Sequence, residues 1–438
     1  MIPTCYPLQG GATLRVLPTQ KFKSSMLSVS AVLPIQRDKV WKTTLLLAVL
    51  RRGTQKYPTL ASINARLDYL FGTELSIRNF YRGDSQIVGF TADFLDASFV
   101  FDKEELLDGI LDVISQILYH PLLDEKGLLL ERYVESEKKL QCESIRALRN
   151  NPRAYALERC LELVYADEPC SAPVTGRIEE IMAIDAAELT AHWRELISSI
   201  RFDCFFVGRG DARALQSRLN AILCAPQGEA LLSPTRLHRL PPHRKEVPAR
   251  VEETLPVSQG QLLLSYRTDI TLTHPDYAAC VLLNEILGAS PISKLFMNVR
   301  EKLGLCYHCA SSFNGFKGTL TIRCGLEPRS REAAEAEILA QLEAIQRGEI
   351  SEEELSAAKK SLENVYRQLT DSPSAMESFY YGRALLGLDA TIDGTRSRFA
   401  HVTTEQIVAA ARGLRLDTVY FLRGTLPSEE TEEYDEED

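Results

Sequence analysis

The sequence predicts an α+β protein of two similar α/β-sandwich domains, each an antiparallel-rich sheet with helices packed on one face. Three observations support this fold class. The chain of 438 residues is too long for one ordinary hydrophobic core. The order of elements near its start recurs about 220 to 235 residues later. In both copies the strands come first and grouped helices follow.

Each copy opens with a strand and a helix that is apolar nearly all round. Residues 26–33 place Leu27, Val29, Ala31 and Leu33 on one face of a strand, and residues 262–266 form the corresponding apolar run. The helix that follows is predicted over residues 39–52 in the first copy and over about 275–287 in the second. A glycine follows each of them, which is a typical helix stop. Both helices are therefore expected to be buried.

A hairpin and several helices complete each copy. Two strand candidates joined by a polar turn predict antiparallel pairing of 74–80 with 86–94, and of 305–313 with 319–326. Two long helices come next in each copy, over residues 103–119, 124–149, 331–347 and 352–369. A further helix starts alike in both, at Asn151-Pro152 and at Ser372-Pro373, with proline in the first turn.

Composition changes divide the chain into four parts. They are an N-terminal domain (1–225), a linker rich in Pro, Arg, His and Ser (226–257), a C-terminal domain (258–427) and an acidic tail expected to be disordered (428–438).

Charge and hydropathy exclude several classes of partner. The formal charge is −10, but the last ten residues hold eight carboxylates, so the remaining body is close to neutral. No basic stripe is present, and nucleic acid is therefore not an expected partner. The sequence has no signal-like start and no apolar stretch of 18 residues, so we expect a cytoplasmic protein without a membrane partner.

The ten cysteines are scattered and are interpreted as mostly buried free thiols. Cys306 and Cys309 have CxxC spacing, but a metal or redox role would need a helix N-terminus or a second pair of ligands. They lie instead in a strand-like run. Enzyme chemistry around Cys306, Cys309 and His308 stays open as a minor alternative.

Gly53-Thr54 directly follows the first buried helix. On this feature and the repeated plan, nearly the whole chain resembles the insulinase-like (inverzincin, M16-type) metallopeptidases, in the branch that includes the mitochondrial processing peptidase. In active members, His-x-x-Glu-His shortly before Gly-Thr binds zinc and supplies the general base. Here the three functional positions become Thr44, Leu47 and Ala48.

These three residues cannot provide two zinc ligands and a base, so the resemblance implies a protein without its own catalytic residues, metal or other cofactor. The family's third ligand, a glutamate on a later helix, would lie near Glu131, Glu135, Glu137 and Lys138, and the choice among them stays open.

The second copy keeps a motif of the family. Arg300-Glu-Lys-Leu-Gly-Leu-Cys-Tyr307 matches the pattern R-E-K-x-G-L-x-Y, in which the resemblance implies that Arg and Tyr contact substrate. The alternative is that Arg300 pairs with Glu301 at a helix end and Tyr307 packs in the sheet. The strand at 72–76 occupies the place where active relatives add substrate as a strand, although an ordinary internal strand is the simpler interpretation.

The resemblance is strongest to the member without a zinc motif in a Gram-positive bacterial pair that is linked by name to 5-aminopentanol modification of elongation factor P. It implies a non-catalytic subunit that supplies Arg300 and Tyr307 to a peptide or protein substrate. The expected partner is a zinc-bearing paralogue or a second copy of the chain. The alternative is a pseudopeptidase scaffold, or a peptide-binding protein without cleavage.

Overall fold

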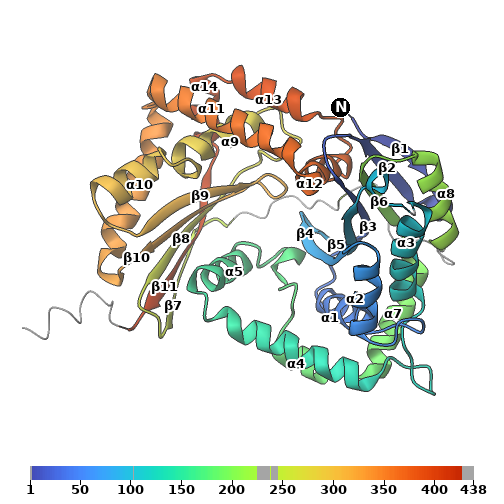
Figure 1. Ribbon diagram of the computed structural model, residues 1–438. Coiled ribbons are helices and arrows are strands. Elements are labelled where there is room, and N and C mark those ends of the chain that lie inside the picture. Colours follow the sequence, from blue (N-terminus) through green and yellow to red (C-terminus); the bar gives the residue numbers. More distant parts are fainter. Residues whose placement is uncertain (1, 102, 224–236, 238–244, 427–438) are drawn as a thin grey trace, which may run out of the picture. The chain divides into compact units, whose positions relative to one another are not determined.

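A computed structural model describes residues 2–101, 103–223, 237 and 245–426 (Figure 1). The predicted tail and most of the predicted linker, residues 226–236 and 238–244, lie outside this range. The chain divides into two compact units, neither of them continuous in sequence. The first comprises residues 1–145, 172–239 and 369–391, and the second comprises residues 146–171, 240–368 and 392–438.

The sheet of the first unit contains six strands among the described residues. Their order is β1 (Thr4–Pro7), β2 (Thr13–Pro18), β6 (Phe202–Gly208), β3 (Ser24–Pro34), β5 (Ser85–Leu95) and β4 (Glu74–Arg82). Only β2 and β6 run parallel, and every other neighbouring pair is antiparallel.

The sheet of the second unit repeats this arrangement with five strands in the described part of the chain. Their order is β7 (Ala249–Leu255), β11 (Arg415–Gly424), β8 (Gly260–Arg267), β10 (Thr319–Leu326) and β9 (His308–Asn314). Again one pair, β7 with β11, is parallel and the others are antiparallel. The predicted α+β class with two antiparallel-rich sheets is confirmed.

Strand β7 corrects the predicted linker 226–257, which is too long at its C-terminal end. Its residues alternate between half-buried and exposed positions, and its exposed positions carry charged or polar side chains such as Arg250 and Glu252. This is the pattern of an edge strand. The strand was hidden in the sequence because Glu253 interrupts the apolar residues of its half-buried face.

The predicted helix 124–149 begins only at Glu131, whereas the predicted helices 103–119, 331–347 and 352–369 lie close to their expected bounds. Both units contain several helices. In the first unit they are α1 (Val40–Leu50), α2 (Leu60–Tyr69), α3 (Lys103–Tyr119), α4 (Glu131–Leu148, of which the last three residues belong to the second unit), α6 (Ile178–Ala183), α7 (Ala186–Ser199) and α8 (Ala212–Ile222). In the second they are α9 (Tyr277–Asn284), the π-helical segments η4 (Glu285–Ala289) and η5 (Leu295–Lys302), α10 (Arg331–Arg347), α11 (Glu352–Gln368), α13 (Ile392–Ala400) and α14 (Thr404–Arg412). Short 3₁₀ turns are η1 (Gln9–Gly11), η2 (Ala97–Phe99), η3 (Pro169–Ser171), η6 (Pro328–Ser330) and η7 (Leu369–Asp371).

Within the described ranges, none of the helices combines the length and the apolar character that a membrane crossing requires.

Two helices are exchanged between the sequence halves. Helix α5 (Pro152–Val164) belongs to the second unit and packs on β8 and β11, whereas α12 (Pro373–Ala384) belongs to the first and packs on β3 and β6. Each begins as predicted, because the side chains of Asn151 and Ser372 accept a hydrogen bond from the backbone three residues later, at 3.2 and 3.3 Å. Each sheet thus carries a helix on the face opposite its main helical layer.

Both exchanged helices cover buried charges. In the first unit Arg78 on β4 contacts Glu377 on α12 at 2.9 Å, and the Ser28 hydroxyl donates to the same carboxylate at 3.0 Å. In the second unit Arg267 on β8 donates to Glu168, just after α5, at 2.5 Å, and Lys317 contacts the other oxygen of Glu168. The side chains of all these ionic residues are less than a tenth exposed. A charge buried to this extent destabilises the folded protein unless it is paired with an opposite charge.

We predict that Glu168→Gln lowers the free energy of unfolding by about 3 kcal/mol or more, because Arg267 and Lys317 would lose their carboxylate in a buried site. The matched control is Glu252→Gln. Glu252 also binds two cations, Arg331 and Arg423, but it is exposed, so we expect a loss below about 1 kcal/mol. Urea unfolding monitored by circular dichroism measures both, and equal losses would contradict this account of the core.

Candidate functional site

The three positions that correspond to the family's zinc motif lie on α1 and are built into the first core. Eight of the eleven residues of α1 are buried. Leu47 is 3% exposed and belongs to the hydrophobic cluster of the unit, while Ala48 is half-buried. Neither side chain carries an atom that can bind a metal or take a proton. These residues do not fit a zinc ion.

Thr44, the one polar residue of the three, is engaged with the protein itself. Its hydroxyl lies 2.6 Å from the carbonyl oxygen of Val174 and 2.7 Å from Nδ2 of Asn79 on β4, which donates to it. A hydroxyl that donates to a carbonyl and accepts from an amide has used its main hydrogen-bonding capacity. The polar side of α1 is thus closed by protein groups.

Residues 172–176, here called the covering segment, supply that carbonyl and are held by two further side chains. The hydroxyl of Tyr81 on β4 donates to the carbonyl oxygen of Ala172 at 2.8 Å. Nε2 of Gln141 on α4 donates to the carbonyl oxygen of Thr175 at 2.6 Å. Together with the bond from Thr44, these contacts fix the covering segment over α1, β4 and α4.

The acidic residues expected near a third zinc ligand lie on α4. Glu137 is buried and binds the guanidinium of Arg52 at the end of α1. Lys138 is buried too, and its ammonium donates to Glu135 at 2.7 Å and to the carbonyl oxygen of Ile184 at 2.9 Å. In the described part of the chain, none of these residues joins a group of three potential metal ligands. Glu135, Glu137 and Lys138 therefore form ion pairs within the protein.

Strand β4 forms an edge of the first sheet. It pairs with β5 on one side, and no strand of the described sheet pairs with its other side. The expectation of an ordinary internal strand at 72–76 was therefore wrong. The alternation of polar and apolar residues did not reveal which strand would lie outermost. An edge offers backbone donors and acceptors that an extended peptide can pair with.

Arg300 and Tyr307 lie in the second unit and are both solvent-accessible. Arg300, in η5, has a side chain that is 44% exposed; its guanidinium lies 4.9 Å from the ring centroid of Phe296 and 3.5 Å from Glu301. Tyr307 is 39% exposed, precedes β9, and donates from its hydroxyl to Glu327 at 3.2 Å. The ion pair with Glu301 is thus present, but Tyr307 does not pack inside the sheet. Both side chains reach the surface of the second unit.

The fold brings a third thiol to the CxxC pair. Cys309 on β9 is the direct cross-strand partner of Cys324 on β10, and Cys306 lies in the loop before β9. Hydrogen bonds from Cys309 and Cys324, together with the nearby cationic Arg300, hold the pKa of the Cys306 thiol well below its ordinary range. Sequence reasoning missed Cys324, although the predicted hairpin of 305–313 with 319–326 already contained it.

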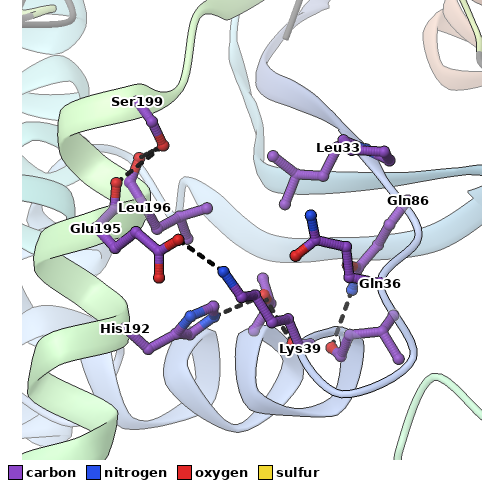
Figure 2. A pocket seen from close by; sticks show the side chains of 11 residues that line it. Leu33, Gln36, Lys39, Gln86, His192, Glu195, Leu196 and Ser199 are labelled. Atoms are coloured by element: carbon purple, nitrogen blue, oxygen red, sulfur yellow. Dashed lines mark hydrogen bonds and ion pairs between the residues drawn. The ribbon is translucent and has the colours of Figure 1, made fainter. Parts of the chain in front are cut away.

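A cavity of about 190 Å³ lies in the first unit beside α1 (Figure 2). Its lining residues are Leu33, Pro34, Gln36, Lys39, Val40, Thr43, Gln86, His192, Glu195, Leu196 and Ser199. Lys39 donates to Glu195 at 2.6 Å, and His192 Nε2 lies 2.9 Å from the Thr43 hydroxyl. Burial lowers the pKa of His192 to about 4, so the imidazole is neutral at pH 7. Because its main polar groups pair with one another, this cavity is a weaker candidate site than the Arg300 surface.

Comparisons with known proteins agree with this geometry. Residues 183–362 match the family model described as the peptidase M16 inactive domain. The chain is 30% identical over 416 residues to YmfF of Bacillus subtilis, described as a probable inactive metalloprotease, and the match covers 95% of this chain and 96% of that protein.

Two solved structures share the fold. A conserved protein from Enterococcus faecalis superposes with a TM-score of 0.87 at 24% identity, over 98% of this chain and all of that one. A chain of complex III₂ from Candida albicans superposes with a TM-score of 0.71 at 15% identity, over 95% and 94% of the two chains. With the degenerate motif on α1 and the long match to an inactive relative, the chain belongs to the M16 peptidase family and is a homologue of an inactive-type member.

Proposed function

We propose that this chain is the non-catalytic, substrate-binding subunit of a two-subunit zinc peptidase, and that it supplies Arg300 and Tyr307 to a peptide cleaved at the partner's zinc. The observation that carries this proposal is the contrast between two sites. The motif positions on α1 are absorbed into packing and hydrogen bonds, whereas the Arg300 and Tyr307 side chains are solvent-accessible.

The chemistry of the two side chains suits an extended peptide. A guanidinium presents a planar set of donors to carbonyl oxygens, and a tyrosine hydroxyl adds a donor on a rigid ring. The Phe296 ring beneath Arg300 limits the directions in which the guanidinium can point. In the proposed complex the Tyr307 hydroxyl exchanges its bond to Glu327 for one to the substrate.

A partner is required because this chain cannot activate water by itself. Thr44, Leu47 and Ala48 offer neither a ligand set nor a base, so cleavage needs a zinc-bearing paralogue. The similarity to a chain of complex III₂, a multi-subunit assembly, supports use of this fold in assemblies. A place in elongation factor P modification belongs to the same proposal and rests on the resemblance alone, since none of the described residues supplies that modification chemistry.

We predict that the purified chain alone does not cleave peptides and that a mixture with its zinc-bearing paralogue does. In the mixture, Arg300→Ala should lower kcat/KM at least about tenfold, because a hydrogen bond from a charged group to the substrate is lost. Arg300→Lys should recover only part of this loss, because an ammonium does not reproduce the planar fork. Initial rates on a quenched fluorescent peptide measure each variant.

The control for this experiment is Arg347→Ala, which removes another exposed arginine from the same unit and should leave kcat/KM unchanged. Gel filtration verifies that each variant still forms the complex. A complex that forms but cleaves nothing would favour the scaffold function instead. Zinc-dependent cleavage by this chain alone would contradict the proposal.

A second prediction concerns the motif position itself. Leu47→Glu restores the acidic residue of active relatives but places a carboxylate in an apolar core, so it should lower the free energy of unfolding by about 3 kcal/mol or more without producing cleavage. Leu47→Met keeps the position apolar and should cost less than about 1.5 kcal/mol. Thermal unfolding of both variants decides whether position 47 is structural.

A further inference from the structure

We propose that Cys306, Cys309 and Cys324 form a binding site for a thiophilic divalent cation of the Zn²⁺ class, with three sulfur ligands and one position open to solvent. The three sulfur atoms all lie within 4.8 Å of one another. This site is separate from the family's zinc position, which lies on α1 in the other unit. It also does not depend on the proposed peptidase function.

The backbone holds two of the sulfurs in place. Cys309 and Cys324 face each other across neighbouring antiparallel strands, and both are buried, at 4% and 0% exposure. Directly opposed residues in such a pair have Cβ atoms roughly 4.5–5.5 Å apart. Their thiols therefore meet on the same face of the sheet, and Cys306 reaches them from the loop that follows η5.

The distances suit coordination after a small adjustment. Zinc–sulfur bonds of about 2.3 Å place the sulfurs of one ion roughly 3.8–4.0 Å apart. Because the sulfurs lie within 4.8 Å of one another, each sulfur–sulfur distance needs to shorten by about 1 Å at most. On binding, three sulfur–metal bonds form and the thiol protons pass to solvent.

The surroundings distinguish this group from ordinary buried cysteines. Cys142, Cys204 and Cys280 are also buried, but none of them joins a group of three potential ligands among the described residues. Cys306 is the least buried of the three, so the proposed route of an ion from solvent to the group passes its loop. The cationic Arg300 lies near Cys306 and partly offsets the negative charge of three thiolates around one divalent ion.

His308 is not a fourth ligand. It neighbours Cys309 on β9, and successive side chains of a strand point to opposite faces. Its ring packs against Gly325, where an added Cβ would lie 2.2 Å from the imidazole. The open fourth position is therefore left for a water molecule or an external ligand.

The test is a cobalt titration of the reduced, full-length chain in oxygen-free buffer, because Co²⁺ bound to thiolates gives intense near-ultraviolet charge-transfer absorption. We expect saturation at one equivalent and loss of the absorption when Zn²⁺ is added. Cys324→Ala should abolish the signal. Cys306→Ser should reduce it by at least about half, since it removes a ligand from a half-buried loop and leaves the core intact.

The matched control is Cys280→Ala, a buried thiol of the same unit, which should leave the titration unchanged. A second measurement avoids variants altogether: Zn²⁺ should slow alkylation of Cys306 in the wild-type chain at least about tenfold, as followed by mass spectrometry. No charge-transfer band at saturating Co²⁺, an undiminished band in Cys306→Ser, or unchanged alkylation of Cys306 would overturn the proposal.

Discussion

The enclosure of α1 is the constraint on which the first unit depends. A helix that is apolar nearly all round must be surrounded by protein, and here sheet, helices and the covering segment surround it. A polar atom on such a helix then needs a hydrogen-bond partner inside the protein. The Thr44 hydroxyl bonds the carbonyl oxygen of Val174, and the Thr43 hydroxyl bonds Nε2 of His192. At the positions where active relatives have zinc ligands and the general base, this chain has side chains that pack in the core or bond to other protein groups.

The exchanged helices cover one face of each sheet and shield it from solvent. Alternate residues of β3 and β8 would expose one face of each sheet, and α12 and α5 cover those faces. A buried ion pair accompanies each contact, between Glu377 on α12 and Arg78, and between Glu168, which follows α5, and Arg267. A buried carboxylate paired with a fixed arginine tolerates few alternative registers, so these pairs help to specify which helix covers which sheet. The second unit presents Arg300 and Tyr307 at its surface.

Much of this fold could be predicted from the sequence, because periodicity in the two copies fixes strands, buried helices and helix starts. The alternating residues of β3 and the capped starts of α5 and α12 are where the pattern placed them. The exchange of the helices could not be predicted, since local pattern does not encode which sheet a helix covers. Strand β7 was missed because Glu253 interrupts the apolar residues of its half-buried face, and Cys324 was missed although the predicted hairpin contained it together with Cys309.

In the proposed complex, the surface around Arg300 and Tyr307 faces a peptide held at a partner's zinc. Photo-crosslinking tests this most directly, with p-benzoylphenylalanine at the exposed position of Leu303, between the two residues, and in a control chain at exposed Val365. The partner carries a Gln in place of its general base, so that bound peptide stays intact. We expect crosslinks to the peptide from position 303 and none from position 365. A stable complex without peptide crosslinks from position 303 would contradict it.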